Sequence, residues 1–443
     1  MMALKAVALA AVFVATTAQA ATPTASYLIQ ASPTYFNSIP QPTGVITSWP
    51  VNTPIPTGNL TTGFFTNYSF PGFPEENQIV TNATSDPNII AAMANIDWTK
   101  VPDAPVTTTA MLTTYNASDP YCWWTYSTCV TPKIDYIPPD LYICPTPGTW
   151  GLTYDDGPLF FWPSTPENAV WAEPNLYNYL EAHDDQKANL MYIGSNILGA
   201  PDAAQRGLND GHVICCHTWS HPSMTQLTNA EVVAEFYYCL KMIKTVLGIT
   251  PRCWRPPYGD VDDRVRSIAW QMGMRTIIWD LDTNDWDIPG DQTPGGDTPY
   301  SVANATFAGW IENREKGNDT KTGHICLEHE LSNSTIALAE FWLPYVQKNY
   351  QTMPATSCNN IAQPYWEDAF VYPIQGTVAV GVNGTATGLK LPGSNGTTTG
   401  SSANPSSSVS TSSAHSGAAH AAELSIFFLG AVVAAAAGAH GLF

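Results

Sequence analysis

Two adjacent carboxylates, Asp155 and Asp156, stand at the end of an apolar run and are followed by Gly157 and Pro158. Two bare carboxylates side by side cannot both be buried cheaply, so a cation, an arginine or water must lie near them. The pair is therefore a candidate functional site. The competing interpretation is a solvated Asp-Asp-Gly-Pro turn, which these residue types also favour.

A second candidate is the histidine pair His217 and His221, four residues apart. On one helical turn or in a tight loop, both imidazoles could reach the same cation. A carboxylate from another strand would complete a His, His, Asp site with open coordination positions. An isolated pair at this spacing is more often structural. Beside an otherwise uncompensated Asp pair, the metal interpretation is preferred.

The elements that must position these side chains follow from hydrophobic periodicity. Thr228 and Glu231 form a capping box before an apolar helical stripe that Gly248 ends. Further helices are expected over 262–272 and 299–313. Strand-like apolar runs occur at residues 150–153, 190–193, 212–216, 252–254, 276–279 and 325–327. Strands that alternate with helices predict an α/β fold with a parallel sheet, closed into a distorted (β/α) barrel.

Polar clusters follow most of these strand-like runs directly. They comprise Asp155 and Asp156, residues 217–221, residues 255–258, residues 282–286, and His329. In a (β/α) barrel the active-site residues occupy the carboxyl ends of the strands. The clusters should therefore lie together at one end of the barrel.

Together these clusters resemble a known family. The segments are Thr-Tyr-Asp-Asp-Gly-Pro at 153–158, His-Thr-Trp-Ser-His at 217–221, Arg-Pro-Pro-Tyr at 255–258, Asp-Thr-Asn-Asp-Trp at 282–286 and Leu-Glu-His at 327–329. In order and spacing they resemble the polysaccharide deacetylases of carbohydrate esterase family four, and most closely the fungal chitin deacetylases. The resemblance covers about residues 144–358. Any one motif would be a weak signal, whereas the ordered set is a strong one.

The resemblance implies a division of labour within the first motif. Asp156, His217 and His221 would bind a divalent metal, with Zn²⁺ as the expected ion and Co²⁺ or Mn²⁺ as alternatives. Asp155 would then act as general base toward the attacking water. Arg255 would pair with Asp155 and keep it ionised and oriented. A surface ion pair is the alternative for Arg255.

The same resemblance assigns the remaining catalytic and substrate-binding positions. The backbone N–H of Tyr258 would stabilise the oxyanion of the reacting acetyl group. His329 would protonate the departing amine, with Asp285 orienting that histidine and raising its pKa. Trp286 and Leu327 would line the pocket for the acetyl methyl group, with core packing as the alternative for both.

The domain organisation is predicted from composition. Residues 1–20 read as a secretory signal peptide. Residues 21–143 form an irregular, glycosylated region, residues 144–358 the catalytic domain, and residues 359–415 an extension with a Ser/Thr-rich stalk. Residues 416–443 read as the signal tail of a glycosylphosphatidylinositol (GPI) anchor, with a transmembrane helix as the alternative.

Cysteines, glycosylation motifs and tryptophans add further expectations. The chain has nine cysteines, an odd set that leaves at least one thiol free or paired between chains; bridges are expected for Cys122 with Cys129 and Cys144 with Cys358. Asn-x-Ser/Thr acceptors stand at Asn59, Asn67, Asn82, Asn116, Asn304, Asn318, Asn333, Asn383 and Asn395. Trp49, Trp98, Trp123 and Trp124 could stack on sugars, although core packing is the preferred interpretation.

Charge and chemistry narrow the expected function. A formal net charge of −20 with only 17 Lys plus Arg argues against a nucleic-acid partner. The expectation is a monomeric, secreted hydrolase, attached to the wall or membrane through a lipid anchor, that removes acetyl groups from the N-acetylglucosamine units of chitin. Alternatives are a deacetylase of chito-oligosaccharides, peptidoglycan or acetylxylan, and a non-catalytic chitin-binding wall mannoprotein.

Overall fold

The computed structural model describes residues 27–51, 69–159, 175–290, 296–380 and 386–390. The predicted signal peptide, the Ser/Thr-rich part of the stalk and the predicted anchor tail lie outside these described residues. None of the described helices combines the length and the apolarity that crossing a bilayer requires.

One parallel sheet organises the described chain. Its strands are β1 (Thr149–Asp155), β2 (Asn189–Tyr192), β3 (Val213–Cys216), β4 (Cys253–Trp254), β5 (Arg275–Thr276), β6 (Leu281–Asp282), β7 (His324–His329) and β8 (Gln351–Pro354). Their order is β5-β4-β3-β2-β1-β7-β6, and β8 pairs with β1 off this path. Within the described residues no pairing joins β5 to β6, so the sheet is a curled, open half-barrel with helices around it. This is the distorted (β/α) barrel that the sequence predicts. Strands β9 (Val378–Val380) and β10 (Ala386–Lys390) form a separate antiparallel pair.

Strand β1 is the centre of the sheet and is buried along its whole length. Burial of every residue along a strand is typical of a parallel sheet that is covered on both faces. The first half of β1 pairs with β8, its last three residues pair with β2, and its other edge pairs with β7. In this register Asp155 lies beside Met191 of β2 and His329 of β7.

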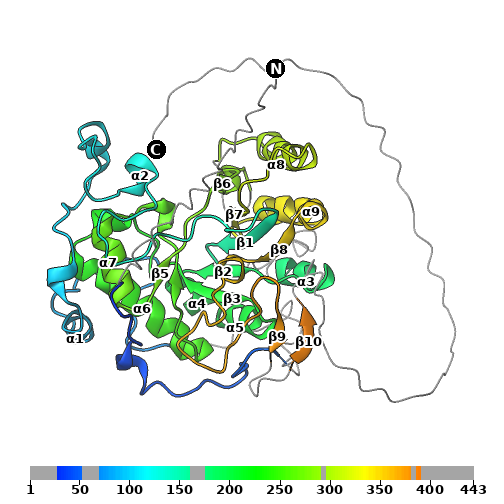
Figure 1. Ribbon diagram of the computed structural model, residues 1–443. Coiled ribbons are helices and arrows are strands. Elements are labelled where there is room, and N and C mark those ends of the chain that lie inside the picture. The colour runs from blue at the N-terminus through cyan, green and yellow to red at the C-terminus, as the bar shows by residue number, and fades with distance from the viewer. Residues whose placement is uncertain (1–26, 52–68, 160–174, 291–295, 381–385, 391–443) are drawn as a thin grey trace, which may run out of the picture. The chain divides into compact units, whose positions relative to one another are not determined.

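The helices pack around this sheet (Figure 1). They are α1 (Pro87–Met93), α2 (Trp124–Ser127), α3 (Asn175–Ala182), α4 (Gly194–Gly199), α5 (Pro201–Asn209), α6 (Asn229–Leu247), α7 (Asp263–Gln271), α8 (Tyr300–Glu315), α9 (Asn333–Asn349) and α10 (Ala355–Cys358). Short 3-10 helices are η1 (Thr34–Phe36), η2 (Trp98–Lys100), η3 (Thr109–Thr113), η5 (Met224–Gln226), η6 (Pro257–Gly259) and η7 (Asp285–Asp287).

The three predicted helices are confirmed as α6, α7 and α8. The capping box of Thr228 and Glu231 forms in both directions, and Gly248 ends α6 with a φ of 73°, the left-handed conformation that glycine adopts most easily. Asp262 caps α7 by accepting a hydrogen bond from the Val265 N–H. Helix α9 was not predicted, although Ser332 begins it with a second capping box.

The strand predictions hold at β1, β2, β3, β4 and β7, whereas one is misplaced. The run at 276–279 was expected to be a strand, but β5 ends at Thr276. Beyond it, Ile277 pairs with Leu141 in an isolated parallel bridge, so a residue from before the first motif occupies that position. Strands β6 and β8 and helices α3, α4 and α5 were not anticipated.

Disulfide bonds tie distant parts of the chain together. Both expected bridges, Cys122–Cys129 and Cys144–Cys358, are confirmed. A third bridge, Cys215–Cys253, joins β3 to β4. The remaining cysteines, Cys216, Cys239 and Cys326, are free and buried.

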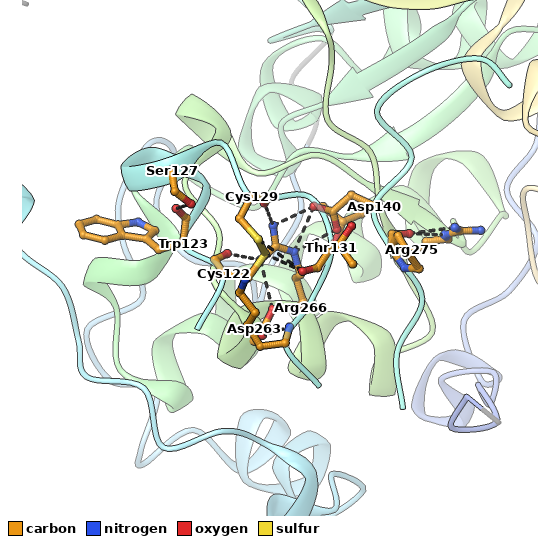
Figure 2. Close-up of polar contacts among 12 residues, drawn as sticks. Cys122, Trp123, Ser127, Cys129, Thr131, Asp140, Asp263, Arg266 and Arg275 are labelled. Carbon is orange, nitrogen blue, oxygen red and sulfur yellow. Dashed lines mark hydrogen bonds and ion pairs between the residues drawn. A yellow bond between two sulfur atoms is a disulfide. The ribbon is translucent and has the colours of Figure 1, made fainter. Parts of the chain in front are cut away.

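A buried arginine fastens the region before β1 to α7. Arg266 Nε lies 3.0 and 3.1 Å from the two carboxylate oxygens of Asp140. Its terminal nitrogens donate to the carbonyl oxygens of Cys122 and Cys129 at 2.5 and 2.8 Å, and one of them also approaches Asp263 at 3.4 Å (Figure 2). The guanidinium is therefore well satisfied despite its burial.

The tryptophans before β1 have different environments. Trp49 is 5% exposed and Trp123 is 3% exposed, so both pack in the core as preferred. Trp98 and Trp124 are half-buried. Only the latter two therefore keep part of the indole available to solvent.

Candidate active site

The carboxylate pair lies where β1 ends and the chain turns. Asp155 is the last residue of β1, and Asp156 follows with a φ of 74°. A non-glycine residue in this left-handed region carries about 1–3 kcal/mol of strain, and such residues concentrate at functional sites. The strained turn aims two neighbouring carboxylates at different partners.

Asp156 faces the two histidines of the second motif. Its Oδ1 lies 3.4 Å from His217 Nε2 and 3.2 Å from His221 Nε2. One ligand atom from each of the three side chains falls within 4.8 Å of the others. The structure thus brings together the metal ligands that the sequence predicts.

The chemistry of this cluster fits a bound cation. The buried Oδ1 of Asp156 has no hydrogen-bond partner among the described residues. The Nδ1 atom of His217 lies 2.8 Å from the Arg255 carbonyl oxygen, so Nδ1 carries the proton and the lone pair of Nε2 points into the cluster. Burial alone would raise the pKa of Asp156, but the charge of His221 and the nearby His217 side chain hold this pKa well below its ordinary value. An anionic oxygen and a lone-pair nitrogen are ligands that Zn²⁺ accepts.

Asp155 has a different partner from Asp156. Arg255 donates from Nη1 to Asp155 Oδ1 at 2.7 Å and to the Thr153 hydroxyl at 2.8 Å. Arg255 is fully buried and Asp155 is 2% exposed, so this is an internal ion pair rather than a surface one. The other oxygen, Oδ2, lies 3.8 Å from His217 Nε2 and therefore faces the edge of the cluster.

His329 lies across the strand pairing from Asp155 and is held by Asp285. The His329 Nδ1 is 2.7 Å from Asp285 Oδ1, and the His329 backbone N–H donates to Asp285 Oδ2 at 2.9 Å. Burial alone would lower the pKa of His329, but the charge of Asp285 and its hydrogen bond raise this pKa to about 10. The imidazole is therefore a proton donor at neutral pH.

The three predicted substrate-binding residues differ in how much of each side chain is exposed to solvent. Tyr258, in η6, is 64% exposed, and its ring centroid lies 4.7 Å from that of His221. Trp286, in η7 next to Asp285, is 46% exposed, which leaves its indole open rather than packed in the core. Leu327 is 4% exposed; it lies two residues before His329 on β7 and so shares its face of the strand.

The sequence indicates no role for Glu330. The structure places this residue against the turn formed by Asp155, Asp156 and Gly157. Its backbone N–H donates to the Asp155 carbonyl oxygen at 3.1 Å, and its Oε2 accepts from the Tyr177 hydroxyl at 2.7 Å. Burial raises the pKa of Glu330 well above its ordinary value. A Cβ added at Gly157 would collide with this carboxyl group. A larger residue at position 157 would therefore require the Glu330 side chain to move. The position of Glu330 one residue after His329 was the only signal.

The fold and this site define a class of protein. The family profile described as polysaccharide deacetylase matches residues 143–277, which contain the Asp156, His217 and His221 cluster together with Asp155, Arg255 and Tyr258. Chitin deacetylase 2 of Cryptococcus neoformans var. grubii is 40% identical over 320 residues, covering 71% of this chain and 67% of that protein. The chain belongs to the polysaccharide deacetylase family.

Other relatives share the same region. Chitin deacetylase of Amylomyces rouxii is 46% identical over 281 residues, covering 62% of this chain and 62% of that protein. Chitin deacetylase 2 of Cryptococcus neoformans var. neoformans is 43% identical, and the match covers 55% of its length. The chain thus spans less than two thirds of these two relatives. A solved chitin deacetylase of Colletotrichum lindemuthianum is 23% identical with a TM-score of 0.43, covering 51% of this chain and 94% of that one, a likeness too distant to carry an inference.

Proposed function

We propose that this protein hydrolyses the N-acetyl groups of β-1,4-linked N-acetylglucosamine in chitin, giving chitosan and acetate, with a divalent metal. The observation that carries the proposal is the separation of the two carboxylates. Asp156 Oδ1 faces two imidazole nitrogens at 3.4 and 3.2 Å, whereas Asp155 Oδ1 is held on Arg255 at 2.7 Å. A ligand and a free base side by side are what metal-assisted amide hydrolysis requires.

The residues of the chain have complementary tasks in this reaction. Asp156, His217 and His221 would hold the metal, which would supply Lewis acidity and could lower the pKa of a water to about 7. Asp155 accepts a proton from the attacking water, whose oxygen bonds to the carbonyl carbon. The Tyr258 backbone N–H donates to the oxyanion that develops on the acetyl group.

Proton delivery completes the reaction. As the carbon–nitrogen bond breaks, His329 gives its proton to the departing amine, and acetate leaves with the oxygen from water. Asp285 stabilises the protonated imidazole through the 2.7 Å contact with Nδ1, which leaves Nε2 as the donor. Trp286 and Leu327 form the pocket for the acetyl methyl group, as part of the same proposal.

The substrate is the least constrained part of the proposal. The relatives at 40–46% identity carry the name chitin deacetylase, which favours chitin over peptidoglycan or acetylxylan. Short chito-oligosaccharides remain the closest alternative, because the motifs specify the acetyl chemistry better than the chain length. Zn²⁺ is proposed as the ion, with Co²⁺ and Mn²⁺ as alternatives, and metal analysis of the purified protein distinguishes them.

We also propose a location at the cell wall and on the outer face of the plasma membrane. The support is compositional: the predicted signal peptide and the predicted GPI-anchor tail, together with a stalk rich in Ser and Thr. The acidic charge of −20 fits a neutral or cationic polymer and argues against nucleic acid as a partner. Release of the protein from membranes by a phosphatidylinositol-specific phospholipase tests the anchor.

The proposed function is tested by acetate release from N-acetylglucosamine oligomers and colloidal chitin, before and after chelation and after metal is added back. Activity should fall at least about tenfold on metal removal and return with Zn²⁺. Turnover that survives thorough metal removal would contradict the mechanism. Binding to chitin without acetate release in any condition would favour the non-catalytic wall protein instead.

A further inference from the structure

The turn that carries Tyr258 has an unusual backbone. Tyr258 has a φ of 57° and Gly259 a φ of 67°, so two consecutive residues occupy the left-handed region. A non-glycine residue stays there only when its surroundings enforce the conformation. The Tyr258 ring cannot supply that constraint, because it is 64% exposed. Other residues packed against the turn must supply the constraint.

Asp260 fixes one end of this turn. The side chain is 3% exposed, and its Oδ1 accepts from Trp123 Nε1 at 2.8 Å and from the Thr125 hydroxyl at 2.7 Å. Its Oδ2 accepts from the Thr225 backbone N–H at 2.9 Å and from the Thr225 hydroxyl at 2.7 Å. Hydrogen bonds to a buried carboxylate are stronger than neutral ones. Half of them come from residues that precede the first catalytic motif.

Trp124 covers the same turn. A Cβ added at Gly259 would collide with the six-membered ring of Trp124, so the indole lies directly on the backbone of the turn. The Trp124 backbone N–H donates to the Val261 carbonyl at 2.9 Å. Its ring centroid lies 4.9 Å from that of Trp279, and the Trp279 ring faces the guanidinium of Arg255 at 5.5 Å. Trp124 therefore bridges the turn and the surroundings of the base.

The segment that carries Trp124 is itself firmly anchored. Residues 119–131, which we call the clamp segment, are closed by the Cys122–Cys129 disulfide, and Arg266 binds the carbonyl oxygens of both cysteines (Figure 2). Asp119 accepts from the Trp123 backbone N–H at 2.9 Å and from the Ser127 hydroxyl at 2.5 Å. A segment held this way can impose a conformation on the turn beneath it.

We propose that the clamp segment is a positioning element of the active site, which holds the Tyr258 backbone N–H where the oxyanion develops. Trp124 of the clamp segment and Asp260 of the turn are the positioning residues, and neither needs to touch substrate. The inference rests on the proposed function, because it assigns a task to the Tyr258 N–H. It also gives the otherwise unassigned region before β1 a supporting part in catalysis.

The test compares Trp124→Ala and Trp124→Phe with Trp98→Ala in the full-length protein. Trp98 is a matched control, because it is a half-buried tryptophan of the same region whose Nε1 donates to the Met93 carbonyl at 3.1 Å. Kinetics on an N-acetylglucosamine tetramer, metal content and thermal unfolding are measured. For Trp124→Ala, kcat should fall roughly tenfold to a hundredfold with KM within about twofold, because a donor used in the transition state is misplaced.

Several readouts separate positioning from other roles. Metal content should stay at the wild-type level in every variant, because the metal ligands lie on other elements. Trp124→Phe, which still covers Gly259, should recover most of the lost kcat, and Trp98→Ala should keep it. A rise in KM with unchanged kcat for Trp124→Ala would overturn the proposal, because Trp124 would then be a sugar contact.

Hydrogen exchange supplies a readout that does not depend on activity. In Trp124→Ala the amides of residues 256–262 should exchange at least about tenfold faster, while those of residues 217–221 should not change. If Trp124→Ala does not fold, the isosteric Asp260→Asn, which keeps part of the hydrogen bonding, serves in the same assays. Wild-type protein without acetate release would refute the proposed function, whereas unchanged exchange in a folded variant would refute the positioning role.

Discussion

The proposed catalytic side chains differ mainly in their interaction partners. Asp155 and Asp156 are neighbours in sequence, yet one bonds a fully buried arginine and the other faces two imidazoles. His329 is buried too, and the charge of Asp285 keeps its pKa raised despite that burial. For His329, a specific charged partner therefore outweighs burial in setting the protonation of the side chain.

Among individual residues, the Asp285 carboxylate should control the alkaline limb of the pH–rate profile. The pKa of His329 is raised to about 10, so the proton-donating form is present below that pH and is lost as the pH rises through it. Asp285→Asn keeps an acceptor near Nδ1 but removes the charge, so the alkaline limb of kcat/KM should move to lower pH by about one unit or more.

The measurement is kcat/KM against pH for wild type and Asp285→Asn at saturating metal. Asp287→Asn is a suitable control, since Asp287 lies in the same 3-10 helix and accepts from Thr298 rather than from His329. An alkaline limb that does not move in Asp285→Asn would mean that His329 is not the group that limits the rate at high pH.

The proposed site residues lie at the carboxyl ends of strands, which bring them together. Strand β1 places Asp155 beside His329 by register, β3 leads into His217, and β4 leads into Arg255. The sequence could predict this convergence, because parallel strands end at one edge of a sheet. It could not predict the clamp segment, because the hydrogen bond between Trp123 and Asp260 spans 137 positions in the chain and leaves no local pattern.

At the element scale Arg266 should be essential for attaching the clamp segment. Arg266→Met would leave the buried Asp140 carboxylate without its partner, and breaking a buried ion pair in this way costs about 3–5 kcal/mol in the free energy of unfolding. Chemical denaturation measures this loss. Lys316→Met is the control, because its pair with Glu312 is 60% and 64% exposed and should contribute less than about 1 kcal/mol. Equal effects of the two substitutions would contradict the assigned role of Arg266.

In the molecule as a whole, features with a local sequence pattern could be predicted, and features that depend on long-range contacts could not. The family resemblance and the parallel sheet of a distorted barrel could be predicted, because the ordered motifs and apolar runs are local features of the sequence. Both expected disulfides are confirmed as well. The bridge Cys215–Cys253 could not be predicted, because strand pairing decides which cysteines meet. Strands β6 and β8 are only two and four residues long, and Pro344 interrupts the helical pattern of α9. Strands β6 and β8 form through pairing contacts that no local window contains.

The central claim is that Asp156 binds the metal while Asp155 stays off it as the base. Asp155→Asn and Asp156→Asn, purified in parallel, test it directly through metal content after mild chelation and through acetate release. Asparagine suits both positions, because it tolerates the left-handed backbone of Asp156. The account predicts that Asp155→Asn keeps the metal of the wild type with kcat lowered at least about a hundredfold, whereas Asp156→Asn loses the metal. Metal lost equally from both variants, or wild-type turnover in Asp155→Asn, would contradict it.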